Sequence, residues 1–419
     1  MAHLLIIELP GGSDSDILQA ACTGGHSFSF ASADMRHYRD QPALWQWLQR
    51  AHTLIDLPGL EAQALMAEVA LLHAQHPVQG LLCLVDIRIQ DAAGIAQMLG
   101  LPFLNPASAA LLRDKFLVRS HLQAKGLAQP PFALACSNAE LQAAVQALGL
   151  PVLIKPVDGF GSQNIVLLRE PEDLDPWLSP LENMLPSGVN YGLGVAANDR
   201  LLVERWMPGI VVGCDTMSHA GVHTLLGTNT KVYYEPPSFA IRGGCFTPWA
   251  GQDPALQAYV FSLLDAVGFD WGAAHVEIML TAQGPALIEI NPRLVGAKIG
   301  RLISLAWGAS VHQWLIDLHL GHALQLPQSV PRHVAATRWV TAMRSGRLAA
   351  LELPAAPAPE VRVVEVLKQA GDAIALPMDN ADRIAYVMTC APTAQAAQDS
   401  AEAYVSACTL HYLDELPAP

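Results

Sequence analysis

The segment over residues 275–296 constrains the fold of this chain more than any other stretch, because it reads as a β-hairpin with polar groups gathered on one face. Apolar residues alternate with Glu277 in its first half, a Gln-Gly-Pro turn occupies 283–285, and Glu289 lies in a second apolar run. A period of two on both sides of a turn predicts paired strands. Pairing would bring the Glu277 and Glu289 carboxylates together, with Asn291 on the same face.

Three oxygen ligands on one face predict a site for a hard divalent cation. Mg²⁺ typically takes one or two protein carboxylates, and substrate phosphates fill further positions. A single carboxylate in a strand is usually solvated, but two that face each other repel unless a cation lies between them. Arg293 follows Asn291 by two residues and would hold an anion beside the cation. The hairpin therefore predicts a metal site next to an anion site.

The overall composition limits the number of domains and the kinds of partner that this chain can have. Its 419 residues suggest roughly three domains, and 52% hydrophobic against 15% charged residues supplies large cores. The formal charge of -14 argues against non-specific binding to nucleic acid or to an anionic membrane. No apolar run reaches the roughly 18 residues that a membrane span needs, and the first ten residues lack a basic signal-peptide region. Seven scattered cysteines without a C-x-x-C pair indicate reduced thiols and a cytoplasmic location.

The two ends of the chain are α/β in pattern. The first hundred residues alternate strand-like and helix-like segments, which predicts a parallel α/β domain. Gly11 and Gly12 follow the first strand, but no G-x-G-x-x-G is present, so a dinucleotide site has little support. The Pro- and Ala-rich run over 353–360 predicts a linker or loop before a last small α/β unit, in which no chemistry is visible.

Two lysines are candidates for phosphate binding. Lys115 is expected in the middle of a helix that begins at Asn105-Pro106, and taken alone it is a surface lysine with a buried stem. Lys155 lies inside an apolar strand, where its ammonium must find an anion. The loop over 158–163 follows it, with small residues whose backbone N–H groups could approach a phosphate. Its spacing fits neither a P-loop nor a Rossmann fingerprint, and a tight hairpin explains it equally well.

Two further segments carry polar groups. Glu204 ends a strand that leads into a Pro-Gly turn at 208–209. The stretch over 223–246 is less regular, and we expect it to form a long loop that carries Lys231 and Arg242. Long loops of this kind often determine substrate specificity.

Five ordered pieces of sequence together resemble the ATP-grasp superfamily. They are RDK at 113–115, IKP at 154–156, VERWMPG at 203–209, HVEIML at 275–280 and LIEINPR at 287–293. The resemblance spans about 101–320, and within the superfamily the hairpin and the C-terminal tail are most similar to L-amino-acid ligases and related carboxylate-amine ligases. It implies a mixed α/β and α+β chain in which two α+β subdomains grip ATP. The implied units are an N-terminal parallel α/β domain (1–104), ATP-grasp subdomain A (105–200), subdomain B with the metal site (201–325) and a C-terminal α/β unit (326–419).

The resemblance also implies a role for each matching residue. For ATP, Lys115 and Lys155 would contact phosphates, the loop containing Asp158, Gly159, Gly161, Ser162 and Gln163 would close over them, and Glu204, Trp206 and Met207 would form the hinge that holds adenine. Glu277, Glu289 and Asn291 would coordinate Mg²⁺, with Mn²⁺ as an alternative. Arg293 and Lys155 would be catalytic. Arg293, His275, Lys231 and Arg242 would contact the substrate. Val211 stands where related proteins often have an acidic residue that binds ribose.

The implied activity is an ATP-dependent carboxylate-amine ligase that forms an amide through an acyl phosphate and releases ADP and phosphate. The expected substrate is an amino acid or small carboxylic acid, in the biosynthesis of a peptide-like natural product or siderophore. Two alternatives stay open, a carboxylate kinase or carboxylase with the same ATP site and an inactive nucleotide-binding regulatory protein. We expect small-molecule partners, no nucleic acid, no membrane and, as in many relatives, a homodimer.

Overall fold

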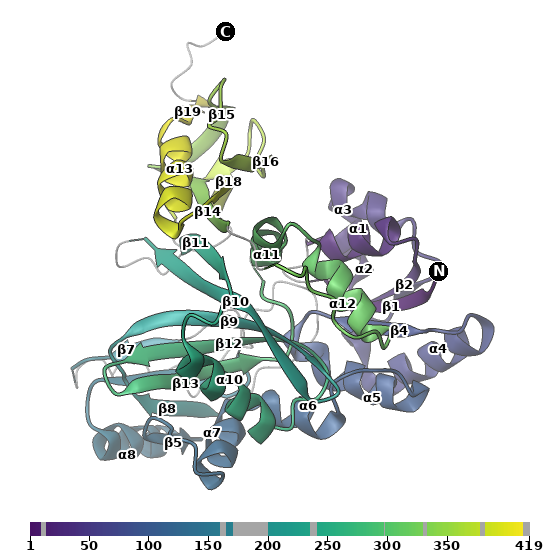
Figure 1. The fold of residues 1–419 in the computed structure, drawn as a ribbon, viewed down its shortest axis with the longest axis vertical. Coiled ribbons are helices and arrows are strands. Elements are labelled where there is room, and N and C mark those ends of the chain that lie inside the picture. Colours follow the sequence, from purple (N-terminus) through teal and green to yellow (C-terminus); the bar gives the residue numbers. More distant parts are fainter. Residues whose placement is uncertain are drawn as a thin grey trace.

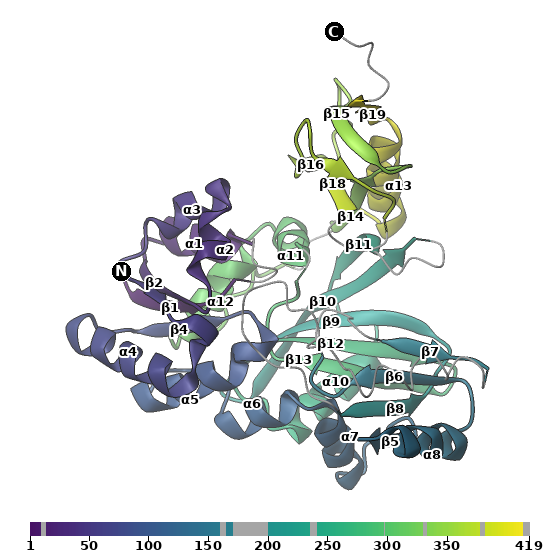
Figure 2. The same ribbon diagram turned by 180° about the vertical axis from the view of Figure 1, so that it is seen from behind.

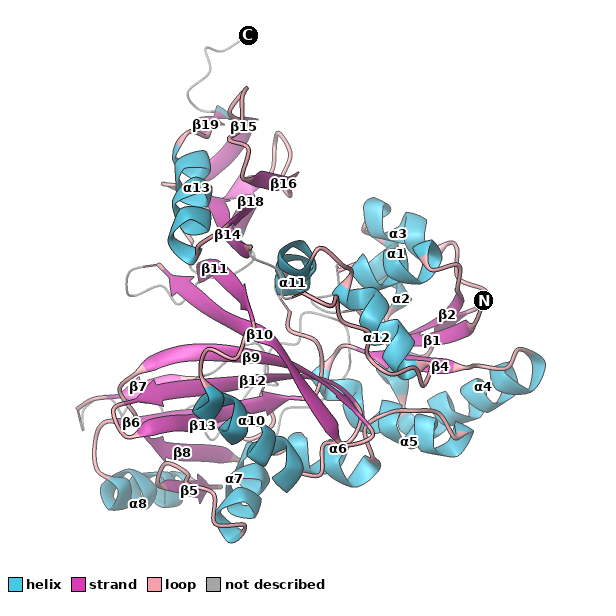
Figure 3. Cartoon of the chain, in the orientation of Figure 1, coloured by secondary structure: helices cyan, strands magenta, loops and turns pink. Residues whose placement is uncertain are grey.

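The computed structural model describes residues 1–9, 14–159, 165–170, 200–234, 241–296, 298–329, 333–377 and 382–413. Within them the chain forms an N-terminal α/β domain, two central antiparallel sheets and a C-terminal unit (Figure 1). Figure 3 separates these helices and strands by colour. None of the helices in the described ranges combines the length and apolar character that crossing a membrane requires.

The N-terminal domain is the parallel α/β unit that the sequence predicts. Its sheet has the order β3-β2-β1-β4, and every pairing in it is parallel. Such an order needs crossover connections, which the helices supply. The strands are β1 (His3–Ile7), β2 (Ser27–Ser32), β3 (Leu54–Asp56) and β4 (Gly80–Cys83). The helices are α1 (Asp16–Thr23), α2 (Met35–Arg39), α3 (Pro42–Leu48), α4 (Ala62–Gln75) and α5 (Ile89–Leu99), with short 3₁₀ turns η2 (Pro58–Leu60) and η3 (Asp86–Arg88).

The first central sheet carries Lys155 and Glu204. Its order is β5-β8-β6-β7, formed by β5 (Phe132–Ala135), β6 (Val152–Pro156), β7 (Val166–Leu168) and β8 (Leu201–Arg205). The helices of this region are α6 (Pro106–Leu112), α7 (Lys115–Ala124) and α8 (Asn138–Leu148). The single helix predicted from Asn105 onward is wrong in one respect. Asp114 is extended, with φ -123° and ψ 106°, and caps a second helix, so Lys115 lies at the start of α7 and not in mid-helix.

The second central sheet has eight strands in the order β13-β12-β9-β10-β11-β14-β18-β16. Its first part consists of β9 (Ile210–His219), β10 (Val222–Tyr233), β11 (Ile241–Pro248), β12 (Gly272–Thr281) and β13 (Gly284–Asn291), accompanied by α10 (Pro254–Ala266), α11 (Ile299–Trp307) and α12 (Val311–His319). The long loop predicted over 223–246 is therefore wrong, because most of it forms the antiparallel pair β10 and β11. Helices α11 and α12 are separated at Gly308, whose φ is +65°.

Three strands of the C-terminal unit extend this same sheet, and its other three strands form a separate small sheet. Its strands are β14 (Val334–Thr341), β15 (Gly346–Glu352), β16 (Val361–Val366), β17 (Ala373–Ile374), β18 (Arg383–Ala391) and β19 (Thr409–Tyr412), and its helix is α13 (Ala394–Ser406). The link is made by β14, which pairs with β11 on one side and with β18 on the other. The views from the two sides both show this unit projecting beyond the central sheets (Figures 1 and 2).

One arginine joins three parts of the molecule. Arg301 lies on α11, which both views place between the N-terminal domain and the C-terminal unit (Figures 1 and 2). Its guanidinium donates to Asp16 at the start of α1, with Nη2 2.6 Å from Oδ1, and to Glu365 on β16 at 2.6 Å. Tyr386 on β18 also accepts from it. We call these four residues the Arg301 junction.

A buried glutamate gives the N-terminal domain a pH-dependent stability. Glu8 follows β1, is fully buried, and accepts hydrogen bonds from Tyr38 Oη at 2.5 Å and from the Ala33 amide at 2.7 Å. Burial outweighs these contacts and raises the pKa of Glu8 to about 7. A raised carboxyl pKa means that the folded state binds a proton that the unfolded state has lost, so stability falls as pH rises from about 4.5 to about 7.

Replacing Glu8 by Gln should remove this dependence. The wild type should lose about 1.4 kcal/mol per pH unit relative to Glu8→Gln across that interval. Chemical unfolding of both proteins between pH 4.5 and 8 measures the difference. Glu61→Gln, an exposed position, serves as the matched control. Parallel curves for wild type and Glu8→Gln would show that Glu8 does not titrate in this range.

Candidate active site

The hairpin β12–β13 forms with the predicted pairing. Glu277 lies opposite Glu289, and His275 lies opposite Asn291. The turn is one residue earlier than expected, since Gly284 already pairs with Thr281 and the connection is 282–283. A register shift after Glu277 leaves Ile288 as an extra, bulged residue. The two carboxylates therefore face each other from neighbouring strands.

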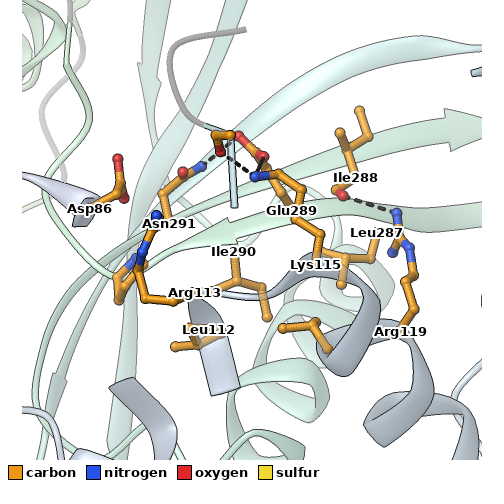
Figure 4. A pocket seen from close by; sticks show the side chains of 13 residues that line it. Asp86, Leu112, Arg113, Lys115, Arg119, Leu287, Ile288, Glu289, Ile290 and Asn291 are labelled. Carbon is orange, nitrogen blue, oxygen red and sulfur yellow. Dashed lines mark hydrogen bonds and ion pairs between the residues drawn. The ribbon is translucent and has the colours of Figure 1, made fainter. Parts of the chain in front are cut away.

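Two lysines bind these facing carboxylates. Lys231 Nζ on β10 lies 2.5 Å from Glu277 Oε1, and Lys115 Nζ on α7 lies 3.5 Å from Glu289 Oε2. Asn291 Nδ2 donates to Glu289 Oε1 at 3.1 Å (Figure 4). Burial alone would raise the pKa of Glu277, but the Lys231 ammonium and His275 hold it well below its usual range. Lys231 was predicted to lie in a substrate loop, but it lies on β10 beside a predicted metal ligand.

This donor set fits Mg²⁺ or Mn²⁺ that arrives with phosphates. Among the described residues, no group of three or more His, Cys, Asp or Glu side chains could hold a metal ion by itself. The predicted set of Glu277, Glu289 and Asn291 has two carboxylates and one amide oxygen. Mg²⁺ is usually bound in this way, with one or two carboxylates and the remaining positions filled by phosphate or water. The residues therefore suit a shared protein–nucleotide site better than a closed protein cage.

His275 contacts both Asp215 and Glu277 through its two ring nitrogens. Its Nδ1 lies 2.9 Å from Asp215 Oδ1 on β9 and its Nε2 lies 3.3 Å from Glu277 Oε1. Burial favours the neutral ring, but Asp215 and Glu277 override it and raise the pKa of His275 to about 9. A Cβ at Gly213 would approach His275 Cε1 to 2.4 Å, so only glycine fits beside the ring. His275 was predicted to line the substrate pocket. It is instead 3% exposed and contacts a predicted metal ligand.

Lys155 has a protein anion as its partner. Its Nζ lies 2.6 Å from Glu204 Oε2, and Arg119 Nε lies 2.5 Å from Glu204 Oε1. All three side chains are buried. Burial alone would raise the pKa of Glu204, but Arg119 and Lys155 lower it to about 2. Sequence reasoning assigned Lys155 to a phosphate and missed Arg119, although Arg119 lies one helical turn after Lys115 on α7.

A pocket opens between these elements. It holds about 400 Å³ of empty space, part of it open to solvent. Figure 4 shows its lining, to which Asp86, Arg113, Lys115, Arg119, Gly159, Glu289 and Asn291 contribute. The RDK segment fixes the start of the small-residue loop, because Arg113 donates to the Asp158 carbonyl at 2.9 Å and Lys115 donates to the Gly159 carbonyl. Of the predicted ATP loop, Gly161, Ser162 and Gln163 lie outside the described residues.

Arg293 links the hairpin to the N-terminal domain. Its Nε donates to Asp86 Oδ2 at 2.6 Å, and its Nη1 donates to the Leu294 carbonyl at 3.1 Å. Sequence reasoning did not select Asp86. The available signal was its place just after β4, since ligands of parallel α/β sheets bind at the carboxyl ends of strands.

The remaining predicted residues lie in two places. Trp206 and Met207 are half-buried just after β8, and the Trp206 amide donates to the Pro151 carbonyl at 3.0 Å, which holds the segment against the start of β6. Arg242 was predicted to contact substrate, but its guanidinium binds Glu402 on α13 of the C-terminal unit. The structure does not bring Arg242 to the pocket.

Two family models match parts of this chain, and two relatives match most of its length. The ATP-grasp domain model matches residues 148–301, and the L-amino acid ligase C-terminal domain 2 model matches residues 338–412. The uncharacterized protein y4rH of Sinorhizobium fredii is 26% identical over 396 residues, covering 91% of this chain and 79% of that protein. Carnosine synthase 1 of Homo sapiens is 24% identical over 305 residues, covering 70% of this chain but only 36% of its own length.

Among solved structures, the L-amino acid ligase from Bacillus licheniformis has a similar fold. It superposes with a TM-score of 0.77 at 19% sequence identity, covering 98% of this chain and 99% of that one. The similarity extends through the N-terminal domain, both central sheets and the C-terminal unit.

Proposed function

Since this chain belongs to the ATP-grasp superfamily of ADP-producing ligases and ends in an L-amino acid ligase C-terminal domain, we propose that it joins an amino acid or small carboxylic acid to an amine. The observation that carries the proposal is the pair Glu277 and Glu289, which lie opposite each other and are each paired with a lysine. A peptide-like natural product or siderophore as the product is proposed from the resemblance alone.

The chemistry requires the carboxylate oxygen to become a leaving group. ATP-grasp enzymes use ATP with Mg²⁺, and Mg²⁺ supplies charge neutralisation on the transferred phosphoryl group. Glu277, Glu289 and Asn291 would hold the cation. Lys115 and Lys231 lie on these carboxylates and can turn to phosphate oxygens, where fixed positive charge stabilises the developing anion.

The other residues position the reactants. Arg293 would hold the acid substrate or its acyl phosphate, because a guanidinium presents donors in a plane that matches a carboxylate. The loop that begins at Asp158 and Gly159 would cover the phosphates, and excluding water protects an acyl phosphate from hydrolysis. Lys155 and the hinge from Glu204 to Met207 would complete the nucleotide site. We propose a cytoplasmic location and a homodimer on the resemblance only.

Nucleotide products test this function. The protein is incubated with Mg²⁺, ATP and a panel of amino acids, hydroxy acids, citrate and small amines, singly and in pairs, while ADP, AMP and phosphate are measured. We expect ADP and phosphate to appear with an acid and an amine together, with the amide detected by mass spectrometry. AMP and pyrophosphate as products would disprove the proposal. An acyl phosphate without amide, or turnover that depends on bicarbonate, would identify a carboxylate kinase or a carboxylase instead.

A further inference from the structure

A row of polar side chains lies behind Glu277 in the second central sheet. Asn229 on β10, Asp215 on β9 and His275 on β12 form it, and none of the three is more than 3% exposed. Asn229 Nδ2 donates to Asp215 Oδ2 at 2.6 Å, and Asp215 Oδ1 lies 2.9 Å from His275 Nδ1. His275 Nε2 in turn lies 3.3 Å from Glu277 Oε1. We call Asn229, Asp215 and His275 the buried row.

A glycine makes room for the buried row. Gly213 on β9 pairs with Glu277 on one neighbouring strand and with Asn229 on the other. A Cβ at this position would lie 2.4 Å from His275 Cε1 and 2.6 Å from Asn229 Oδ1. The imidazole and the amide therefore occupy the space that a side chain at 213 would fill, and both are held against the backbone of β9.

The hydrogen bonds of the buried row have a fixed direction. An ionised carboxylate only accepts hydrogen bonds, and the ring of His275 lies between two carboxylates. Both ring nitrogens therefore donate, Nδ1 to Asp215 and Nε2 to Glu277. Asn229 turns its NH₂ group to Asp215, and its own buried Oδ1 has no hydrogen-bond partner among the described residues. A buried acceptor without a donor is unfavourable, so the orientation of this amide is set by Asp215.

The contacts of Glu277 within the described part of the chain all reach one of its two oxygens. Lys231 Nζ lies 2.5 Å from Oε1, and His275 Nε2 lies 3.3 Å from the same atom. Lys231 has a flexible stem and can turn to a phosphate, whereas His275 is buried and held by Asp215. His275 is therefore the contact that stays on Oε1 when Lys231 leaves, and Oε2 is available to another partner.

We propose that Asp215 is a positioning residue for metal binding, because it holds His275 where Nε2 donates to Glu277 Oε1 and leaves Oε2 for the cation that arrives with the nucleotide. This assignment rests on the proposed function. Hydrogen-bond partners behind a metal ligand fix the orientation of that ligand. Asn229 fixes Asp215 in the same manner, one step further from the cleft.

The variant Asp215→Asn tests this assignment with little change of shape. The Asn229 amide can turn over so that its unpaired oxygen accepts from the new amide, whose carbonyl oxygen still accepts from His275 Nδ1. A neutral ring with its proton on Nδ1 cannot donate to Glu277. We expect the apparent Kd for Mn²⁺, measured by electron paramagnetic resonance with a saturating non-hydrolysable ATP analogue, to rise about 10- to 100-fold.

The matched control is Asp265→Asn. Asp265 on α10 also pairs with a histidine, since its Oδ1 lies 3.2 Å from His223 Nε2, but its side chain is 70% exposed. The same chemical change there should leave the Kd for Mn²⁺ at the wild-type value.

A second substitution separates positioning from a purely structural role. In Asp215→Asn/His275→Gln, the glutamine amide can donate to Glu277 without help from Asp215, so Mn²⁺ affinity should return close to that of the wild type. Asp215→Asn/His275→Ala has no donor at this position and should bind as weakly as Asp215→Asn. Thermal unfolding of each variant identifies a folding defect. If Asp215→Asn does not fold, the comparison of the two double variants decides, because both have an uncharged row.

Three results would overturn the assignment. They are an unchanged Kd in Asp215→Asn, equal Kd values in the two double variants, and a wild type that binds no Mn²⁺ with the nucleotide. The binding measurement needs neither acid nor amine. A wild type that binds Mn²⁺ and nucleotide but forms no amide would contradict the proposed function and leave this assignment standing, so the two failures are distinguishable.

Discussion

Replacing Glu289 by Gln should lower ADP formation by roughly 10²- to 10³-fold, the loss typical of removing one charge-stabilising group from a transition state. The amide keeps the shape and one acceptor oxygen, so Asn291 can still donate to it, but the negative charge that faces Glu277 is lost. Steady-state ADP release under saturating ATP and Mg²⁺ measures the effect. We expect the unfolding midpoint to stay within a degree or two of the wild type, because relief of the repulsion between the two carboxylates offsets the loss of the pair with Lys115.

The matched control for this variant is Glu352→Gln. Glu352 lies on β15 in the C-terminal unit, with a side chain that is 68% exposed and paired with His411. The same chemical change at that position should leave ADP formation intact. Binding of Mn²⁺ in the presence of a non-hydrolysable ATP analogue, followed by electron paramagnetic resonance, should weaken in Glu289→Gln only. Unaltered turnover in Glu289→Gln would remove Glu289 from the metal site.

Replacing Glu204 by Gln should destabilise the protein by about 3–5 kcal/mol, the range for breaking a buried ion pair from one side. Glu204 is the shared partner of Lys155 and Arg119, and both cations are almost fully buried. The neutral amide would leave two positive charges close together without compensation. Urea unfolding at pH 7 measures the loss, and Glu68→Gln on the exposed side of α4 is the control. A loss below about 1 kcal/mol would show that the triad is exposed to water in solution.

The same variant should also change the response to acid. The pKa of Glu204 is lowered to about 2 in the folded state, so its ionisation stabilises the fold above about pH 4.5. That contribution is lost as pH falls from about 4.5 towards 2. The stability gap between wild type and Glu204→Gln should therefore narrow by roughly 3 kcal/mol over this interval. A gap that is constant with pH would mean that the carboxylate is not the origin of the difference.

Local patterns in the sequence were sufficient to predict the hairpin and the N-terminal domain. The position of Glu277 opposite Glu289 follows from apolar residues that alternate with a period of two on either side of a short turn. Both glutamates lie within a stretch of fifteen residues. The parallel domain follows from alternation of strands and helices. Gly243 and Gly244 lie within β11, although paired glycines usually mark a loop. In the structure a Cβ at Gly243 would lie 2.4 Å from the Thr337 carbonyl oxygen, so glycine is needed there for β11 to approach β14.

Contacts between distant residues could not be predicted in this way. Asp86 and Arg293 are 207 residues apart, and Arg119 and Glu204 are 85 apart. The sequence around one residue of such a pair contains no indication of the other residue. For Lys155, sequence reasoning correctly required an anion but could not choose between a phosphate and the carboxylate of Glu204. The break of the helix at Asp114 was missed because an aspartate inside a helical pattern is also compatible with a continuous helix.

The two lysines that pair with the hairpin carboxylates neutralise the charge of these carboxylates before any nucleotide enters. Glu277 and Glu289 contribute two negative charges, and Lys231 and Lys115 contribute two positive charges. A lone divalent cation would have to displace both ammonium groups from the carboxylates, whereas a lone nucleotide would draw those groups away and leave two carboxylates facing each other. When the metal and the phosphates enter together, the metal replaces the ammonium groups beside the carboxylates. The phosphates then replace the carboxylates as partners of the ammonium groups. We therefore expect the cleft to take up the metal–nucleotide complex as one unit, with neither component bound firmly by itself.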